Sequence, residues 1–216
     1  MTELFNTNGK KIGEDKKGKD GTVSIILDRK KAKQIADNYK KGILVSKNEV
    51  NAGVLLTKVI LEEALNVLKR TENNGGLREE CSIITETGKV IKGKRGELPK
   101  VKNGVQIAET SLPKLSDDES MKSIATIHSH PILVQELNGF YYPQTATEPT
   151  FHPDLWVFVW YKTNIIVGNL VKPNIRLGAG KVYVSKPKRG AAIYKRCQGD
   201  KPVLILGEKA IEKIIK

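Results

Sequence analysis

Ser123-Ile124-Ala125-Thr126-Ile127-His128-Ser129-His130-Pro131 is the stretch of this chain that says most about its fold and its chemistry. The residues before His128 are rich in β-branched side chains, which favour a strand. Pro131 has no N–H to donate and therefore ends the strand. Side chains two residues apart in a strand point to the same face, so His128 and His130 converge at the strand's end. Two imidazoles and a carboxylate from elsewhere make a three-ligand zinc site with one position open, which is typical of catalytic zinc.

The His-x-His spacing by itself is weak evidence for a metal site. The context strengthens it, because the chain has three histidines and two of them lie in this motif. A suitable acid also follows downstream. We therefore interpret the motif as a pair of metal ligands and look for a third.

Two residues downstream are candidates for the third ligand, Asp154 and His152. Both residue types bind zinc. Asp154 stands where a short polar segment opens into an apolar one, a place where a ligand carboxylate can be held firmly. The alternative for His152 is an exposed loop imidazole.

A hydrolytic zinc site also needs a general base to accept a proton from water. Glu79 and Glu80 lie in a segment that we expect to be a strand, residues 77–85. Glu79 shares a face with the apolar Cys81 and Ile83, where a carboxylate is costly unless a cation or a proton compensates it. A metal-bound water would provide that compensation, so Glu79 is the better candidate. We expect Glu80 to form a surface pair with Arg78.

One helix is predicted from both its start and its periodicity. Ser46 and Glu49 have the spacing of a capping box, and apolar residues recur at helical spacing as far as Leu68. The Asn73-Asn74-Gly75-Gly76 cluster is expected to end this helix near residue 72.

The remaining pattern is mostly strands and turns. Asn8-Gly9 and Asp20-Gly21 are hairpin-turn signals, a strand is expected at residues 22–27, and residues 30–41 are a basic linker or weak helix. Residues 132–151 are interpreted as a long loop, and residues 156–161 with 164–167 as a hairpin. Further strands are expected at residues 88–93, 104–111, 123–128, 181–185, 191–194 and 203–206. A terminal helix is expected at residues 209–216. One helix before a run of strands, with a helix at the end, indicates an α+β fold.

Composition indicates a globular chain without a membrane span. At 216 residues, with 39% hydrophobic and 28% charged residues, one sizeable core and a small appendage are expected. No apolar run has the length of a transmembrane helix, and residues 1–6 lack the features of a signal peptide. We therefore expect a cytoplasmic protein or one exported by a specialised secretion system.

The chain is strongly basic, with a formal net charge of +13. Such a charge favours an acidic partner: nucleic acid, an anionic surface or an acidic immunity-type protein. The lysines are spread along the chain, so a solvated lysine-rich surface explains the charge equally well. The two cysteines, Cys81 and Cys197, form no disulfide framework and no zinc-binding pair, and we expect free thiols.

Together these residues resemble the JAB/MPN (JAMM) metalloprotease family. In that family a Glu on a strand precedes His-Ser/Thr-His-Pro, and a later Pro-Ser-x-x-Asp supplies an Asp. The resemblance covers roughly residues 46–216 and implies an MPN-like, cytidine-deaminase-like mixed sheet flanked by helices. It implies that His128, His130 and Asp154 hold Zn²⁺ and that Glu79 is the acid/base.

The resemblance further implies cleavage of a peptide or isopeptide bond in a protein substrate, which can be ubiquitin-like. The family's serine, which stabilises the oxyanion, has Thr150 as its nearest counterpart, although Thr150 lies four residues before Asp154 rather than three. The loop before the aspartate is also longer than in the family pattern.

Residues 5–15 are similar to segments that precede C-terminal toxin domains in bacterial Rhs-type polymorphic toxins. We accordingly expect an N-terminal arm and basic linker at residues 1–45, followed by a JAB-like toxin or processing domain at residues 46–216. Two alternatives remain open. One is a metal-dependent phosphoesterase acting on nucleic acid, although such enzymes usually need more ligands than this chain offers. The other is a non-catalytic MPN-like scaffold that binds a partner without metal.

Overall fold

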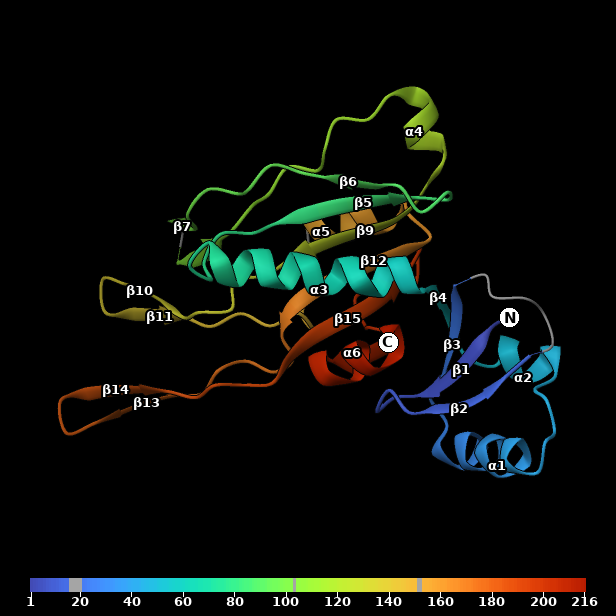
Figure 1. Cartoon of the computed structure of the whole chain (residues 1–216). Coiled ribbons are helices and arrows are strands. Elements are labelled where there is room, and N and C mark those ends of the chain that lie inside the picture. Colours follow the sequence, from blue (N-terminus) through green and yellow to red (C-terminus); the bar gives the residue numbers. More distant parts are fainter. Residues whose placement is uncertain (16–20, 103, 151–152) are drawn as a thin grey trace. The chain divides into compact units, whose positions relative to one another are not determined.

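The computed structural model describes residues 1–15, 21–102, 104–150 and 153–216. The chain forms two compact units, residues 1–62 with 206–216, and residues 63–205. Their boundaries lie at other positions than the predicted division after residue 45. Both units combine helices with a sheet of mixed strand direction, which confirms the α+β class (Figure 1).

The first unit is built on a four-stranded sheet with the order β2-β1-β3-β4. Its strands are β1 (Glu3–Asn6), β2 (Lys11–Glu14), β3 (Thr22–Ile26) and β4 (Val54–Thr57). Its helices are α1 (Arg29–Lys40), α2 (Lys47–Asn51) and α6 (Glu208–Ile215). The core includes Leu4, Ile12, Ile26, Ala32, Ile35, Val45 and Val50. The strand at residues 22–27, a helix near residues 30–41 and the terminal helix are thus confirmed.

The predicted turn at Asn8-Gly9 joins β1 to β2. Gly9 has a φ of +75°, and a Cβ there would lie 2.3 Å from the carbonyl oxygen of Ala210 in α6. Glycine is required because the turn needs positive φ and also approaches a helix backbone. The predicted turn at Asp20-Gly21 includes Asp20, which lies outside the described residues.

The prediction of one helix over residues 46–72 is wrong in its middle. The capping box of Ser46 and Glu49 is present, but it starts only the short α2. Gly53 then brings the backbone so close to β3 that a Cβ would lie 2.2 Å from Ser24 Oγ, and β4 follows as a partner of β3. Helix α3 (Lys58–Asn73) begins only after Thr57, whose hydroxyl accepts a hydrogen bond from Ile60 N at 3.3 Å. Tertiary strand pairing has overridden the helical period.

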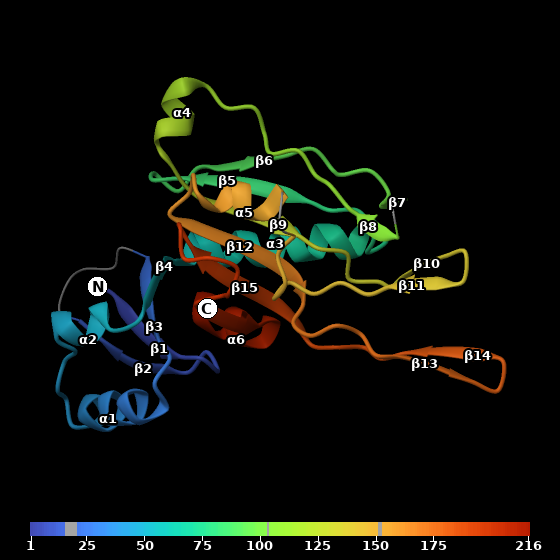
Figure 2. The same ribbon diagram turned by 180° about the vertical axis from the view of Figure 1, so that it is seen from behind.

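The second unit is built on a six-stranded sheet with the order β16-β15-β12-β9-β5-β6. The strands are β5 (Cys81–Thr85), β6 (Val90–Lys92), β9 (Ser123–Ser129), β12 (Thr163–Asn169), β15 (Arg189–Lys195) and β16 (Leu204–Gly207). β9 and β12 are parallel, whereas β5–β6, β5–β9 and β12–β15 are antiparallel. Helix α3 covers one face, and α5 (Pro153–Phe158) lies on the other (Figures 1 and 2).

Two other predictions are corrected in this unit. Residues 132–151 are not all loop, because β10 (Gln135–Leu137) and β11 (Phe140–Tyr142) form a hairpin there. The expected strand at residues 156–161 is replaced by α5. Asp154 and Phe158 are both buried at a spacing of four, which is helical, while Trp156 between them is 65% exposed.

The second unit also contains short peripheral elements. These are β7 (Lys100–Lys102), β8 (Val105–Ile107), α4 (Asp117–Met121), β13 (Ile175–Gly178) and β14 (Lys181–Val184). Within the described residues, no helix is long and apolar enough to cross a membrane. Cys81 is buried and Cys197 is exposed, and both are free thiols.

Candidate metal centre

The two motif histidines lie at the end of β9 on the face that carries α5. His128 stands opposite Cys81 of β5 and Ile166 of β12, and the His130 backbone N–H donates to Val167 O at 2.9 Å. The sheet therefore fixes the backbone on both sides of the motif. The two ring centroids are 5.4 Å apart, as expected for side chains at a spacing of two.

Asp154 in the first turn of α5 meets both rings. His128 Nε2 lies 3.2 Å from Asp154 Oδ1, and His130 Nε2 lies 3.1 Å from Asp154 Oδ2. In a tetrahedral site with bonds of about 2.0 Å, neighbouring ligand atoms are about 3.3 Å apart. The three side chains are buried, and one ligand atom from each lies within 4.8 Å of the others. This triad could hold a metal ion.

A buried nitrogen without a hydrogen bond supports this interpretation. Despite its distance from Asp154, His128 Nε2 makes no hydrogen bond of acceptable geometry with any described residue. An unpartnered buried polar atom costs about 1–3 kcal/mol, and a metal ion would satisfy it. Two imidazole nitrogens and a carboxylate oxygen are also a donor set that suits a first-row divalent metal.

Outer contacts hold two of the three ligands in place. His130 Nδ1 lies 2.9 Å from the carbonyl oxygen of Thr145. If Nδ1 carries the proton, it donates to that carbonyl and leaves Nε2 free as a ligand, as is usual for metal-binding histidines. Asp154 Oδ2 accepts hydrogen bonds from Thr150 N at 2.7 Å and Thr150 Oγ1 at 2.8 Å.

The charges within the triad reinforce one another. Burial by itself would raise the pKa of Asp154, but the neighbouring His128 and His130 rings outweigh it and hold that pKa well below 3.8. Burial would likewise lower the pKa of His130, but its hydrogen bond and charge interaction with Asp154 raise that pKa above 6.5. Asp154 is therefore an anion, which is the form that binds metal.

Glu79 lies on the same side as the triad. Glu79, His128 and Asp154 all line one cavity of about 170 Å³. The pKa of Glu79 is raised to about 8, chiefly by burial; the charge of His130 opposes the rise, and the charges of Asp154 and Glu109 add to it. A carboxyl group with a pKa near neutrality is suited to acid/base chemistry. Glu79 lies on the same side as Cys81 and the triad, as predicted, although the strand expected at residues 77–85 begins only at Cys81.

Glu80 faces the opposite side of the sheet and is buried, so the predicted surface pair with Arg78 is wrong. Its carboxylate lies 3.5 Å from Arg70 Nε and 3.3 Å from Arg95 Nε, and it accepts a hydrogen bond from Asn74 Nδ2 at 2.8 Å. Helix α3, which supplies Arg70 and is followed directly by Asn74, covers this face. Its side chains therefore reach Glu80.

Ser129, between the two histidines, also faces α3. Its backbone N–H donates to Glu80 O at 2.9 Å, and its Oγ accepts from Glu80 N at 2.9 Å. Thr71 Oγ1 of α3 donates to the same Oγ at 2.6 Å. Ser129 thereby ties the segment that carries the ligands to the segment that carries Glu79.

A second cavity, of about 420 Å³, opens beside His130 and Thr150. Its wall includes the half-buried Tyr141 and Tyr142 from β11. The triad thus borders one cavity at His128 and another at His130.

The structure brings together His128, His130, Asp154 and Glu79, and it places Thr150 against Asp154. His152, the other candidate for the third ligand, lies outside the described residues. Sequence reasoning missed the supporting residues Thr71, Arg70 and Thr145. No local signal marks them, because their roles depend on contacts across long separations in the chain. Comparisons of the chain with protein-family models, with curated proteins and with solved structures gave no match.

Proposed function

We propose that this protein is a zinc-dependent hydrolase that cleaves peptide or isopeptide bonds. The observation that carries the proposal is the buried His128–His130–Asp154 triad with a protonatable Glu79 on the same cavity. Three protein ligands leave a fourth position open for water or substrate, which is typical of catalytic zinc. The resemblance to the JAB/MPN family, carried by the same residues, supports an MPN-like fold for the mixed sheet.

Three of the residues would bind the metal, and Glu79 would transfer protons. His128, His130 and Asp154 would hold Zn²⁺, which supplies Lewis acidity that polarises a scissile carbonyl and acidifies water. Since Asp154 Oδ2 accepts two hydrogen bonds from Thr150, we assign Oδ1 as the ligand atom. Glu79 accepts a proton from the attacking water and returns it to the leaving amine nitrogen. A nearby cation lowers the pKa of a carboxyl group, which brings Glu79 into its base form.

Thr150 keeps its proposed role as the donor that stabilises the oxyanion, with one condition. Its hydroxyl donates to Asp154 in this structure, so it must turn from Asp154 to reach a substrate oxygen. Until it does so, Thr150 orients the ligand carboxylate. The two roles predict different effects of its replacement.

The substrate is proposed to be a protein or peptide, including ubiquitin-like proteins, and the biological setting a secreted bacterial toxin or its processing. The similarity of residues 5–15 to segments of Rhs-type toxins supports this setting. The net charge of +13 suits an acidic immunity-type partner.

The test is metal analysis of four variants after zinc loading. We expect His128→Ala and Asp154→Ala to lose bound zinc, and His152→Ala to retain it if Asp154 is the third ligand. We expect Glu79→Gln to retain zinc and to lose turnover in a screen of peptides and ubiquitin-like conjugates. Glu109→Gln, an exposed carboxylate at the same cavity, is the matched control and should remain active.

Zinc content that does not depend on His128 or Asp154 would reject the metal centre. A wild-type chain that stays without zinc after loading would favour the non-catalytic scaffold. Full turnover by Glu79→Gln would reject the acid/base assignment while leaving the metal centre standing.

A further inference from the structure

The chain between β12 and β15 forms a two-stranded ribbon, β13–β14, that extends away from the six-stranded sheet (Figures 1 and 2). The two-residue turn Ala179-Gly180 joins its strands, with φ values of 49° and 71°, as in a type I′ turn. Two hydrogen bonds close its base, from Ser185 N to Asn174 O at 2.9 Å and from Asn174 N to Ser185 Oγ at 2.8 Å. The ribbon is thus a defined hairpin.

The ribbon has one aliphatic face that is largely exposed. Ile175 pairs with Val184 and Leu177 with Val182, so these four side chains share a face. Leu177 is 75% exposed, and Val182 and Val184 are also exposed. An isolated two-stranded hairpin is marginally stable in water and needs a packed face. An exposed aliphatic face on such a ribbon therefore indicates a surface that another molecule covers.

The charge around this face has a single sign. Residues 155–199 contain nine Lys and Arg and no Asp or Glu. Arg176, Lys181, Lys186 and Lys188 are exposed on or beside the ribbon and form no ion pair with the described residues. A molecule that docks along this ribbon therefore also meets uncompensated positive charge, with Arg176 and Lys181 on the face opposite the aliphatic side chains.

We propose that the β13–β14 ribbon is the docking surface for an acidic protein that adds a strand to the ribbon's edge. Each outer edge of a two-stranded ribbon carries unpaired backbone N–H and C=O groups, which are a template for strand addition. A partner strand with alternating aliphatic and acidic residues satisfies all three features at once. Its backbone pairs with the ribbon's edge, its aliphatic side chains lie beside those of the ribbon on one face, and its acidic side chains lie beside Arg176 and Lys181 on the other.

Other occupants match fewer of these features. A lipid bilayer would leave the backbone groups of the edges without partners in hydrocarbon. A nucleic acid would meet the cations but has no use for four aliphatic side chains. A second copy of this chain would bring the same positive charge against it. The proposal does not depend on the metal centre or on any catalytic activity.

The test is the binding of a fluorescein-labelled eight-residue peptide of alternating valine and glutamate to the full-length chain, followed by anisotropy. We expect the paired substitution Leu177→Ser/Val182→Ser to weaken binding by at least about tenfold, through loss of apolar contact. The matched control, Ile43→Ser/Leu98→Ser, replaces two exposed aliphatic residues outside the ribbon and should bind the peptide as the wild type does. A peptide with four valines followed by four glutamates should bind more weakly, since it cannot present the two faces.

Two further measurements separate docking from simple charge attraction. Arg176→Gln/Lys181→Gln should weaken binding and reduce its salt dependence, whereas Lys33→Gln/Lys201→Gln, with the same change in net charge, should not. Hydrogen exchange of the amides at residues 175–184 should slow in the complex if a strand is added.

If the ribbon and control variants weaken peptide binding equally, the proposal is overturned and the binding is non-specific charge attraction. It is equally overturned if the ribbon variants weaken binding to phosphatidylserine vesicles or duplex DNA while leaving peptide binding intact. Sedimentation that shows a dimer lost on Leu177→Ser/Val182→Ser would assign the surface to a second copy instead.

Discussion

The hydroxyl of Thr71 on helix α3 donates a 2.6 Å hydrogen bond to the hydroxyl of Ser129, the residue between the two histidines of the metal centre. Both residues are fully buried. The same Ser129 oxygen accepts from Glu80 N, next to Glu79. A single serine therefore connects a helix on one face of the sheet to the ligands and the acid/base on the other.

This connection predicts that Ser129 positions the site. Ser129→Ala leaves Glu80 N without its buried acceptor, which costs about 1–3 kcal/mol, whereas Thr71 Oγ1 can still donate to Val67 O at 3.0 Å. We expect a matching loss in the free energy of unfolding, measured by urea titration, together with weaker zinc binding. Thr71→Ser, which keeps the hydroxyl, serves as the control. Wild-type zinc affinity in Ser129→Ala would show that the serine supports the fold and not the site.

Replacing Thr150 separates its two roles. Because its N–H and hydroxyl both bond Asp154 Oδ2, Thr150→Val removes one of the two contacts that orient the ligand. Loss of such an outer contact typically weakens metal binding about 10- to 100-fold, and we expect this range in a competition titration with a chelator. Unchanged affinity combined with reduced turnover would instead assign the hydroxyl to the oxyanion alone.

Glu79 predicts a pH dependence of stability in the metal-free protein. Its pKa is about 8 in the folded chain, against 4.5 for the ordinary group. Between these values the unfolded chain releases the proton and the folded chain keeps it, so stability falls as the pH rises. Each pKa unit corresponds to about 1.4 kcal/mol. Below pH 4.5 the contribution is fully present, and above pH 8 it is lost.

Glu79→Gln should lack this dependence, because the amide carries no charge at any of these pH values. We expect the wild type to lose roughly 4 kcal/mol relative to Glu79→Gln between pH 5 and pH 8. Chemical denaturation of both chains in the presence of a chelator measures the difference. Parallel pH profiles would show that Glu79 titrates normally.

Arg70 is the cation of a buried charge cluster with Glu63 and Glu80 on the α3 side of the sheet. Its removal is expected to lower the free energy of unfolding strongly. Arg70 donates to Glu63 Oε1 at 2.9 Å and to Ser82 Oγ at 2.9 Å, and it lies beside Glu80. Arg70→Met leaves two buried carboxylates without this partner, which costs about 3–5 kcal/mol. Arg95→Met, whose side chain is 61% exposed, should cost less than about 1 kcal/mol. Thermal unfolding of the two variants gives the comparison, and equal losses would contradict it.

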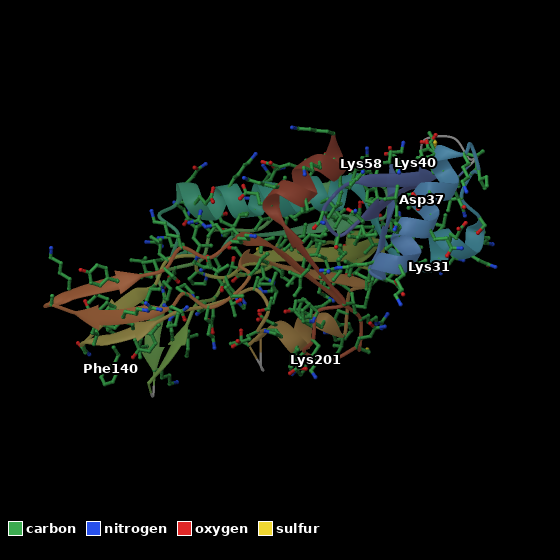
Figure 3. All side chains as sticks on the ribbon, turned by 90° about the horizontal axis from the view of Figure 1, so that it is seen from below. Lys31, Asp37, Lys40, Lys58, Phe140 and Lys201 are labelled. Carbon is green, nitrogen blue, oxygen red and sulfur yellow. The ribbon has the colours of Figure 1, made fainter. Side chains whose placement is uncertain are left out.

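Several local features were predictable because local chemistry determines them. The strand that carries the histidines, the capping box at Ser46 and the Asn8-Gly9 turn were all predicted from neighbouring residues and are present. The side of the sheet on which Glu79 lies followed from the two-residue period of an extended chain. The β10–β11 hairpin, which includes the labelled Phe140 (Figure 3), was not predicted, because strands of three residues are too short to show a clear alternating pattern.

The helix over residues 46–72 was predicted wrongly because its apolar period fits a helix locally. What breaks the helix is the pairing of β4 with β3, from a part of the chain about 30 residues earlier. The α5 segment was taken for a strand for a related reason. Its aromatic residues have high strand propensity, but Asp154 and Phe158 face inward while Trp156 between them is exposed, and a strand would turn all three side chains to one face.

The sequence by itself determined which residues can bind metal and where one strand must end, because side-chain chemistry and a period of two are local properties. Only the tertiary structure decided that Asp154 reaches both histidines, that Glu80 is buried against Arg70, and that one aliphatic face of a ribbon is largely exposed. Those outcomes depend on which distant segments pack together. Packing is set by the balance of burial and pairing over the whole chain, and no short stretch of residues contains it.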